Sequence, residues 1–241
     1  MFAIGSNLFY KSCFSQIASG CRSIALSIVV VAAGCTGTHR KLSFEAGIAR
    51  TKQFVDQYGA VPSTSCPGYL KGILTRTVGS RSNSFEVTVL ATSLPLALSP
   101  GGNRILVSKG LLLLLNTEAQ AAFMLTHEAG HYILNHLQLA MDAAGSDRNG
   151  AGVEVRRELE IEADTFALSR IVDASYEPTE AVAALSAVYR GVESSGRASE
   201  YPSLHDRILA LSTLVLQAHS LGSGIADRRG FRQCHFELRG Y

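Results

Sequence analysis

The pentapeptide His127-Glu-Ala-Gly-His131 constrains this chain of 241 residues more than any other stretch. On an α-helix, residues four apart lie on one face, so the two imidazoles can reach the same metal ion. Glu128 would lie beside that ion, where a carboxylate can take a proton from a water molecule. The pattern HExxH therefore predicts one Zn²⁺ per chain, held in part by His127 and His131, with Glu128 as the catalytic base.

The residues around this pattern indicate a buried helix. Thr117 and Gln120 have the spacing of a capping box at its start. The residues that follow are apolar on nearly every side, which is typical of a helix inside a protein core. Because unpaired buried polar groups are costly, two histidines and a glutamate on such a helix need partners, and a metal ion would provide them.

The remaining pattern predicts an α+β fold, mainly helical, with a small β-sheet next to the HExxH helix. Runs rich in β-branched residues predict strands at Phe85–Ala91 and Arg104–Ser108. Five leucines at 111–115 fit either a short buried helix or the end of a hairpin. Further helices are predicted at Leu42–Tyr58, at Val153–Asp173, from Pro178 to about Glu193, and from Ser203 onward.

Glycine, proline and polar residues predict the loops. Loops are expected at 59–72, at Gly145–Gly152 and at 194–202, and the polar tail at 222–241 should be loosely ordered. A hydrophobic content of 46% is enough for one domain over 35–241, with its core at about 42–220. The net charge of +2, with no basic stripe, argues against nucleic acid as a partner.

The first 34 residues look like a targeting segment. Lys11 and Arg22 precede the apolar run 24–34, which is shorter than the ~18 residues needed to span a bilayer. The sequence Ala32-Ala-Gly-Cys35 resembles a bacterial lipoprotein box, which implies a signal peptide at 1–34 and a lipidated Cys35. Thr36 in place of Asp implies the outer membrane, on its periplasmic side. The alternative interpretation of the apolar run is a short buried helix.

Two cysteines remain after such a cleavage, apart from the lipidated one. In an oxidising compartment, the even pair Cys66 and Cys234 predicts a disulfide between the early mature chain and the carboxyl tail. The alternative is two separate thiols.

A catalytic zinc site takes a third protein ligand and leaves a position for water. The metzincin pattern would place a histidine where Leu137 stands, so that pattern fails. His136 lies one residue short, and a structural hydrogen bond at the helix end is its expected role. A glutamate from the later helix is the other option, and Glu160 shares a face of that helix with Asp164.

The run from His127 to His136, followed by Glu160-Ile-Glu-Ala-Asp164, resembles the HtpX-like and CAAX-prenyl-protease-1-like family of zinc metallopeptidases. Its soluble bacterial members include periplasmic enzymes such as the β-barrel assembly-enhancing protease. The resemblance covers about Asn103 to Leu211 and implies a zincin-like fold. It also implies that Glu160 is the third ligand, and that Asp164 orients a ligand or pairs with Arg207.

One position departs from the family pattern. Family members often carry a histidine six residues before that arginine, and Tyr201 stands there instead. A phenol could donate a hydrogen bond to a transition-state oxyanion, or Tyr201 could simply pack against its neighbours.

The resemblance implies a zinc-dependent endopeptidase that acts on periplasmic or outer-membrane polypeptides, including misfolded ones, with outer-membrane assembly proteins as candidate partners. The strand Arg104–Ser108, if it is an edge strand, would hold an extended substrate by β-augmentation. The loop at 145–152 could act as a lid. The hypothesis from another class is a lipid-anchored, chaperone-like or binding factor in which zinc serves structure or gating.

Overall fold

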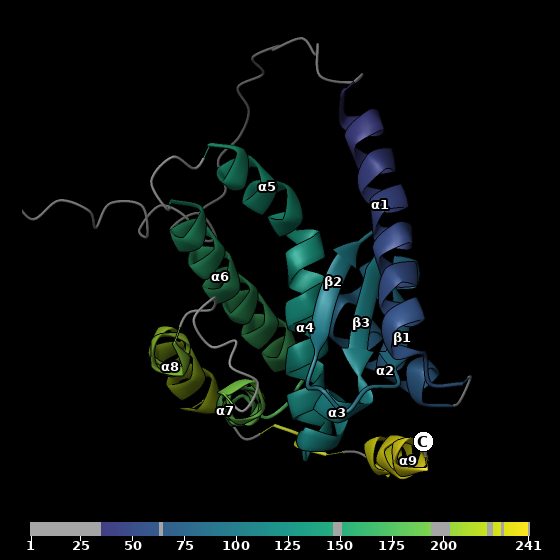
Figure 1. Ribbon diagram of the computed structural model, residues 1–241. Coiled ribbons are helices and arrows are strands. Elements are labelled where there is room, and N and C mark those ends of the chain that lie inside the picture. The colour runs from purple at the N-terminus through teal and green to yellow at the C-terminus, as the bar shows by residue number, and fades with distance from the viewer. Residues whose placement is uncertain are drawn as a thin grey trace, which may run out of the picture. The chain divides into compact units, whose positions relative to one another are not determined.

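The computed structural model describes residues 35–62, 65–146, 151–193, 203–220, 224–227 and 229–240. It confirms the α+β class, with many helices around one small mixed sheet (Figure 1). The elements, in chain order, are α1 (Cys35–Tyr58), α2 (Ser65–Val78), the 3-10 helix η1 (Gly79–Ser84), β1 (Glu86–Leu90), β2 (Ala97–Gly101), β3 (Arg104–Ser108), α3 (Lys109–Leu114), α4 (Glu118–Ile133), α5 (His136–Ser146), α6 (Ala151–Asp173), α7 (Thr179–Glu193), α8 (Leu204–Ser220) and α9 (Arg229–Arg239).

The three strands are arranged in the order β1-β3-β2. β1 runs parallel to β3 and β2 runs antiparallel to it. The two predicted strands are therefore present, but β3 is the central strand, so the expectation that it forms an edge is wrong. The sequence also concealed β2, because Pro100 lies within it. Proline cannot donate to a strand ladder and is tolerated on an edge strand, which is the place that β2 occupies.

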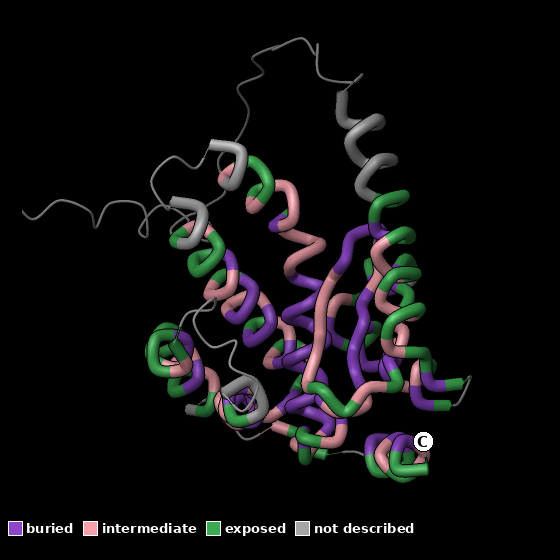
Figure 2. Tube along the Cα trace, viewed as in Figure 1, coloured by how far each residue is buried: buried purple, intermediate pink, exposed green. Residues whose placement is uncertain are grey.

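The HExxH helix α4 begins where the capping residues predict. Thr117 Oγ1 accepts a hydrogen bond from Gln120 N at 3.2 Å. Gln120 Oε1 in turn accepts from the backbone N–H of Asn116 at 2.8 Å, one residue earlier than in the usual capping box. All residues of α4 from Glu118 to Gly130 are buried (Figure 2). The helix packs against both β2 and α6.

Helix α2 occupies most of the segment that was expected to be a loop at 59–72. Pro67 lies in the first turn, where backbone N–H groups have no partner within the helix and proline is tolerated. Leu70, Ile73 and Leu74 follow at helical spacing and are fully buried. The loop prediction is wrong because these apolar residues contribute more to the fold than the glycines and proline between them oppose it. α2 packs against both β1 and α4.

The carboxyl tail is ordered where α9 forms, so the expectation of a loose tail is wrong for residues 229–239. Phe231, Cys234 and Leu238 share one face of α9 and are buried. A disulfide joins Cys234 to Cys66 on α2, with a Cα–Cα distance of 4.7 Å. The apolar face and the covalent link together hold α9 against the core.

The helix boundaries decide the predictions for the leucine run, for the two later helices and for the loop at 145–152. The leucine run forms α3 with the first part of its length, and α6 and α7 lie within two residues of their predicted bounds. α5 continues to Ser146 and α6 begins at Ala151, so the predicted loop is shorter at both ends, and its centre at 147–150 lies outside the described residues. No helix in the described part of the chain has the length and apolar character required to cross a membrane.

Candidate metal centre

Helix α4 presents His127 and His131 one turn apart, as their spacing predicts. Their Nε2 atoms are 3.0 Å apart. The His127 side chain is 4% exposed and that of His131 is 19% exposed, so the second ring reaches the surface. α4 ends at Ile133, two residues after His131. Asn135, just beyond that end, takes a left-handed conformation with φ 62°.

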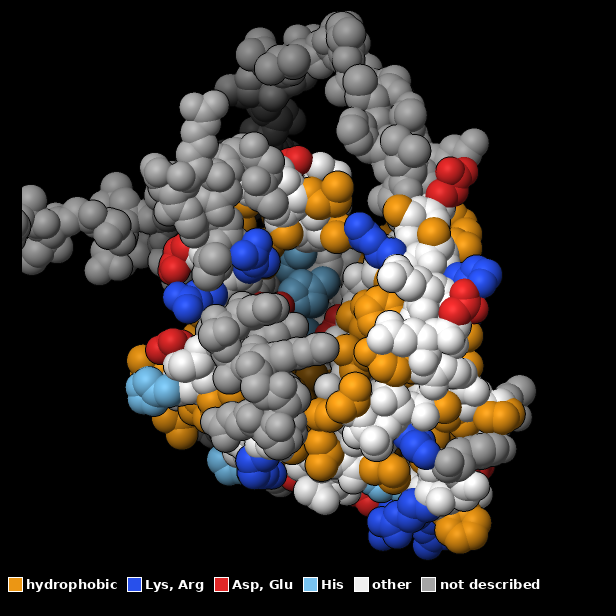
Figure 3. All heavy atoms as spheres, in the orientation of Figure 1, with side chains coloured by type: hydrophobic (Ala, Val, Ile, Leu, Met, Phe, Trp, Pro, Cys, Tyr) orange, Lys and Arg blue, Asp and Glu red, His pale blue; other side chains and the backbone are white. Residues whose placement is uncertain are grey.

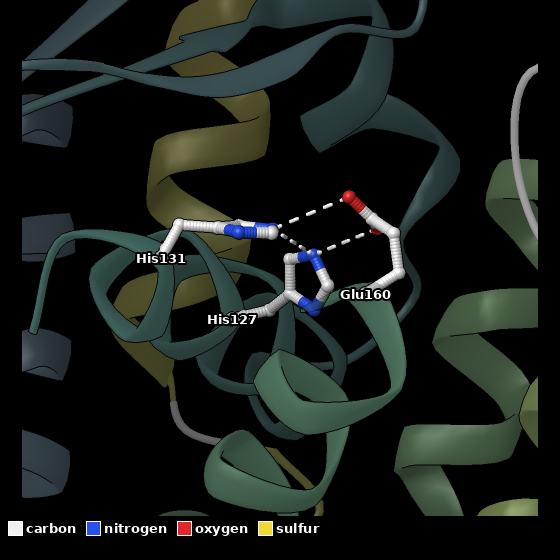
Figure 4. A group of neighbouring side chains, drawn as sticks. All are labelled: His127, His131 and Glu160. Carbon is white, nitrogen blue, oxygen red and sulfur yellow. Dashed lines mark hydrogen bonds and ion pairs between the residues drawn. The ribbon is translucent and has the colours of Figure 1, made fainter. Parts of the chain in front are cut away.

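Helix α6 brings Glu160 to the same point (Figure 4). One carboxylate oxygen lies 3.4 Å from His127 Nε2, and the other lies 3.4 Å from His131 Nε2. Gly130 allows the two helices to approach this closely, because an added Cβ there would come within 3.0 Å of the Phe166 ring on α6. The structure thus assembles the three residues that the sequence and the family resemblance indicated.

The three groups fit a tetrahedral ion. Two imidazole nitrogens that face each other at 3.0 Å need a proton or a cation between their lone pairs. Zinc ligands at roughly 2.1 Å from the ion in tetrahedral geometry stand about 3.4 Å apart, close to the separations of 3.0 and 3.4 Å found here. A set of two histidines and one glutamate is also a usual donor set for catalytic zinc. Among the described residues, these three form the cluster that could hold a metal ion.

The proposed base, Glu128, is buried beside the histidines. Burial raises the pKa of its carboxyl to about 7, while the charge of His127 and a hydrogen bond from the Ser99 backbone oppose the rise. Ser99 belongs to the edge strand β2, so this strand and the carboxylate meet directly. A carboxyl with a pKa near neutrality can both accept and return a proton at physiological pH.

Behind His127 lies a buried ion pair. Asp164 Oδ1 is 2.9 Å from His127 Nδ1. Arg207, on α8, donates to the two oxygens of Asp164 through Nε at 2.6 Å and Nη2 at 2.5 Å. Both supporting residues predicted from the family resemblance therefore lie in contact with the cluster. Arg207 Nη1 also lies 3.7 Å from Glu160, so one cation faces both carboxylates.

Burial and the neighbouring charges shift the pKa values of the three candidate ligands strongly in the metal-free protein. Burial opposes the imidazolium form of His127, but hydrogen bonds to Asp164 and Glu160 outweigh it and raise the pKa of His127 to about 10. Burial, followed by the charge of His127, lowers the pKa of His131 to about 3. Although burial opposes ionisation of Glu160, its neighbours His127, His131 and Arg207 lower the pKa of its carboxyl to about 2.

Two residues near the cluster were not singled out as site residues by the sequence. His136 was expected to make a structural hydrogen bond, and it does so with a ligand, because its Nδ1 lies 2.9 Å from His131 Nδ1. Tyr189 on α7 is buried, and its ring lies 6.0 Å from the Arg207 guanidinium carbon. Burial raises the pKa of the Tyr189 hydroxyl. Nothing in the spacing along the chain distinguished this tyrosine from the other core residues of its helix.

Other predicted residues lie outside the site or outside the described residues. Tyr201 falls in the latter group, so its two alternative roles remain predictions. The signal peptide at 1–34 also falls there, while Cys35 is the first residue of α1. Figure 3 shows histidine side chains at the floor of a hollow whose rim carries hydrophobic and basic groups.

Residues 115–226 match the family model Peptidase U49. The match covers just under half of the chain and spans α4 to α8, so it includes the three candidate ligands, Glu128 and the Asp164–Arg207 pair. It omits the sheet and α2. The Peptidase U49 match indicates a peptidase family and supports a proteolytic function. No match is found among curated proteins.

Proposed function

We propose that the protein is a zinc-dependent endopeptidase of the HtpX-like type. One observation carries the proposal: two imidazole nitrogens and one carboxylate converge, with a second, buried carboxylate next to them on the same helix. The Peptidase U49 match over the same residues supports it. The same donor set also suits other divalent transition metals, so metal analysis of the purified protein is part of the test.

His127, His131 and Glu160 would hold the ion, which supplies Lewis acidity toward a water molecule and a peptide carbonyl. Glu128 accepts a proton from that water and returns it to the departing amine of the cleaved bond. Its buried position beside the two histidines suits both transfers. Asp164 accepts a hydrogen bond from His127 Nδ1, which leaves the Nε2 lone pair directed at the centre of the cluster.

The edge strand β2 takes the substrate-binding role that was expected of β3. β3 has partners on both sides, whereas β2 is paired on one side only. The Ser99 backbone reaches Glu128, which indicates that the free edge of β2 faces the catalytic carboxylate. An extended peptide added along this edge would bring its main chain beside the metal cluster. This arrangement supports cleavage within a polypeptide rather than of a small molecule.

The substitution Glu128→Gln tests the proposal. It removes the base and keeps the size of the side chain, so cleavage of an unfolded substrate such as casein should fall about 10²–10⁴-fold while the metal content is unchanged. Glu158→Gln, an exposed glutamate on α6, is the matched control and should leave cleavage unaltered. Cleavage that persists in Glu128→Gln, or that resists a chelator, would rule out the mechanism. The chaperone-like alternative instead predicts suppression of aggregation without cleavage.

The proposed location rests on the sequence alone. We infer that the mature chain begins at a lipidated Cys35 and resides at the outer membrane, facing the periplasm, where misfolded outer-membrane polypeptides and their assembly factors would be within reach. A disulfide between Cys66 and Cys234 suits an oxidising compartment of this kind. Mass spectrometry of the amino-terminal peptide from a membrane fraction would reveal the acyl chains or their absence.

A further inference from the structure

His136 contacts the metal cluster from outside it. Its Nδ1 is 2.9 Å from His131 Nδ1, and the two rings are nearly perpendicular, with centroids 5.0 Å apart and an interplanar angle of 76°. The residue is only 2% exposed. A buried imidazole at this distance from another imidazole must share one proton with it, because two facing lone pairs would repel each other.

The position of that proton follows from the role of His131. His131 Nε2 faces His127 and Glu160, so its lone pair is the one available to a metal ion. The proton of a neutral His131 must then be on Nδ1, which donates to the Nδ1 lone pair of His136. The proton of a neutral His136 is therefore on its Nε2.

The far side of His136 ends at a carboxylate. His136 Nε2 makes no hydrogen bond within the described residues, and Glu162 Oε2 lies 3.4 Å from it. The Glu162 side chain is well exposed to solvent. Starting from the cluster, the groups follow in the order His131, His136 and Glu162, and the last of them is exposed to solvent.

The backbone is shaped to make this contact. On an uninterrupted helix, a residue five positions after His131 would point about 140° away from it, at 100° per residue. The positive φ of Asn135 ends α4 and starts α5 at His136, which turns the ring of His136 back toward His131. Asparagine is one of the few residues besides glycine that tolerates this conformation.

We propose that His136 is a positioning residue that fixes the ring orientation and tautomer of His131 for metal binding. It is not a fourth ligand, because its Nδ1 faces the nitrogen of His131 that points away from the cluster. The inference rests on the proposed function only in requiring that His127, His131 and Glu160 bind a metal ion. Outer partners of this kind typically change metal affinity by 10–100-fold when they are removed.

The first experiment measures Zn²⁺ affinity by competition with a chromogenic chelator, without any assay of cleavage. His136→Leu removes the acceptor and should weaken binding about 10–100-fold. His136→Asn places an amide oxygen close to the position of Nδ1 and should recover much of the loss. His205→Leu, at an exposed histidine of α8, is the matched control and should bind as tightly as the wild type.

The second experiment examines the hydrogen bond in the unmodified protein. In zinc-loaded protein with ¹⁵N-labelled histidine, the ring nitrogens of His131 and His136 should show a scalar coupling across the N–H···N bond. This measurement needs no variant, so it still decides the question if His136→Leu does not fold. A missing coupling, or equal Zn²⁺ affinity in wild type and a folded His136→Leu, would overturn the proposal. Failure of the wild type to bind any metal would instead overturn the proposed function.

Discussion

The two imidazole ligands of the candidate metal centre have unlike surroundings. His127 is almost fully buried, and its outer nitrogen faces Asp164, a carboxylate that Arg207 holds with two short hydrogen bonds. His131 is more exposed, and its outer nitrogen faces a second histidine, His136. Both ligands come from the same helix, one turn apart, so the difference arises from what α5, α6 and α8 place behind them.

We call the Asp164–Arg207 pair behind His127 the charged wall of the site, and His136 behind His131 its neutral wall. The ligand at the neutral wall, His131, is the more exposed of the two histidines. A carboxylate acceptor makes an imidazole more basic, whereas an imidazole acceptor orients the ring without adding charge. The pKa values in the metal-free protein reflect this contrast, with His127 raised to about 10 and His131 lowered to about 3. The Asp164 side therefore places negative charge behind His127, and the His136 side places none behind His131.

The largest expected effect comes from breaking the charged wall. Arg207→Leu leaves the buried carboxylates of Asp164 and Glu160 with the His127 imidazolium as their one remaining cation within the cluster, so the free energy of unfolding should fall by about 3–5 kcal/mol. Urea denaturation of the metal-free protein measures this change. Arg157→Leu is the control, because that exposed arginine lies 3.8 Å from Glu154 and should alter stability by less than about 0.5 kcal/mol. Similar losses in the two variants would show that the buried pair contributes no more to the free energy of unfolding than the exposed pair does.

The next prediction compares the two histidines through the pH dependence of Zn²⁺ affinity. A metal ion needs the Nε2 lone pair of His127, and the raised pKa of about 10 means that a proton occupies the ring at neutral pH. Zn²⁺ affinity should therefore rise about tenfold per pH unit through the neutral range and up to about pH 10. His131, with a pKa of about 3, contributes no proton competition in this window. Titrations in chelator buffers corrected for their own protonation would give the slope.

A slope near two, in place of one, would mean that both histidines compete with protons and that their surroundings are equivalent. The metal-free protein gives an independent check of the sign. Because the folded state binds the His127 proton more tightly than the unfolded chain does, the stability from this group is complete below about pH 6.5. It is lost as the pH rises toward 10. Stability that increased over this range would contradict the assignment.

The sequence was sufficient for the parts of this site that depend on local spacing. HExxH placed the two candidate histidine ligands and the candidate base on one helix, and the capping residues indicated where that helix starts. The resemblance supplied Glu160, Asp164 and Arg207. The helix α2 was missed because its glycines and proline indicate a loop when they are considered residue by residue. Its apolar face becomes decisive only once β1 and α4 are present to cover it.

The neutral wall depends on tertiary geometry that spacing does not reveal. The role of His136 follows from one positive φ angle at Asn135, which redirects the chain between two helices. The central place of β3 follows from its pairing with β2, an edge strand that its proline concealed. Such features are set by the packing of distant segments, so a helical or strand period along the chain carries no signal for them.

The smallest expected effect tests where the neutral wall ends. Glu162 is exposed and lies 3.4 Å from His136 Nε2, a geometry in which water and salt weaken the attraction. Glu162→Gln should therefore lower Zn²⁺ affinity only about two- to fivefold, corresponding to roughly 0.4–1 kcal/mol, with a smaller loss at high salt. Glu158→Gln, one turn earlier on α6, is the matched control and should have no effect. A loss as large as that of His136→Leu would mean that the Glu162 carboxylate governs the histidine pair, and that the two walls of the site are both charged.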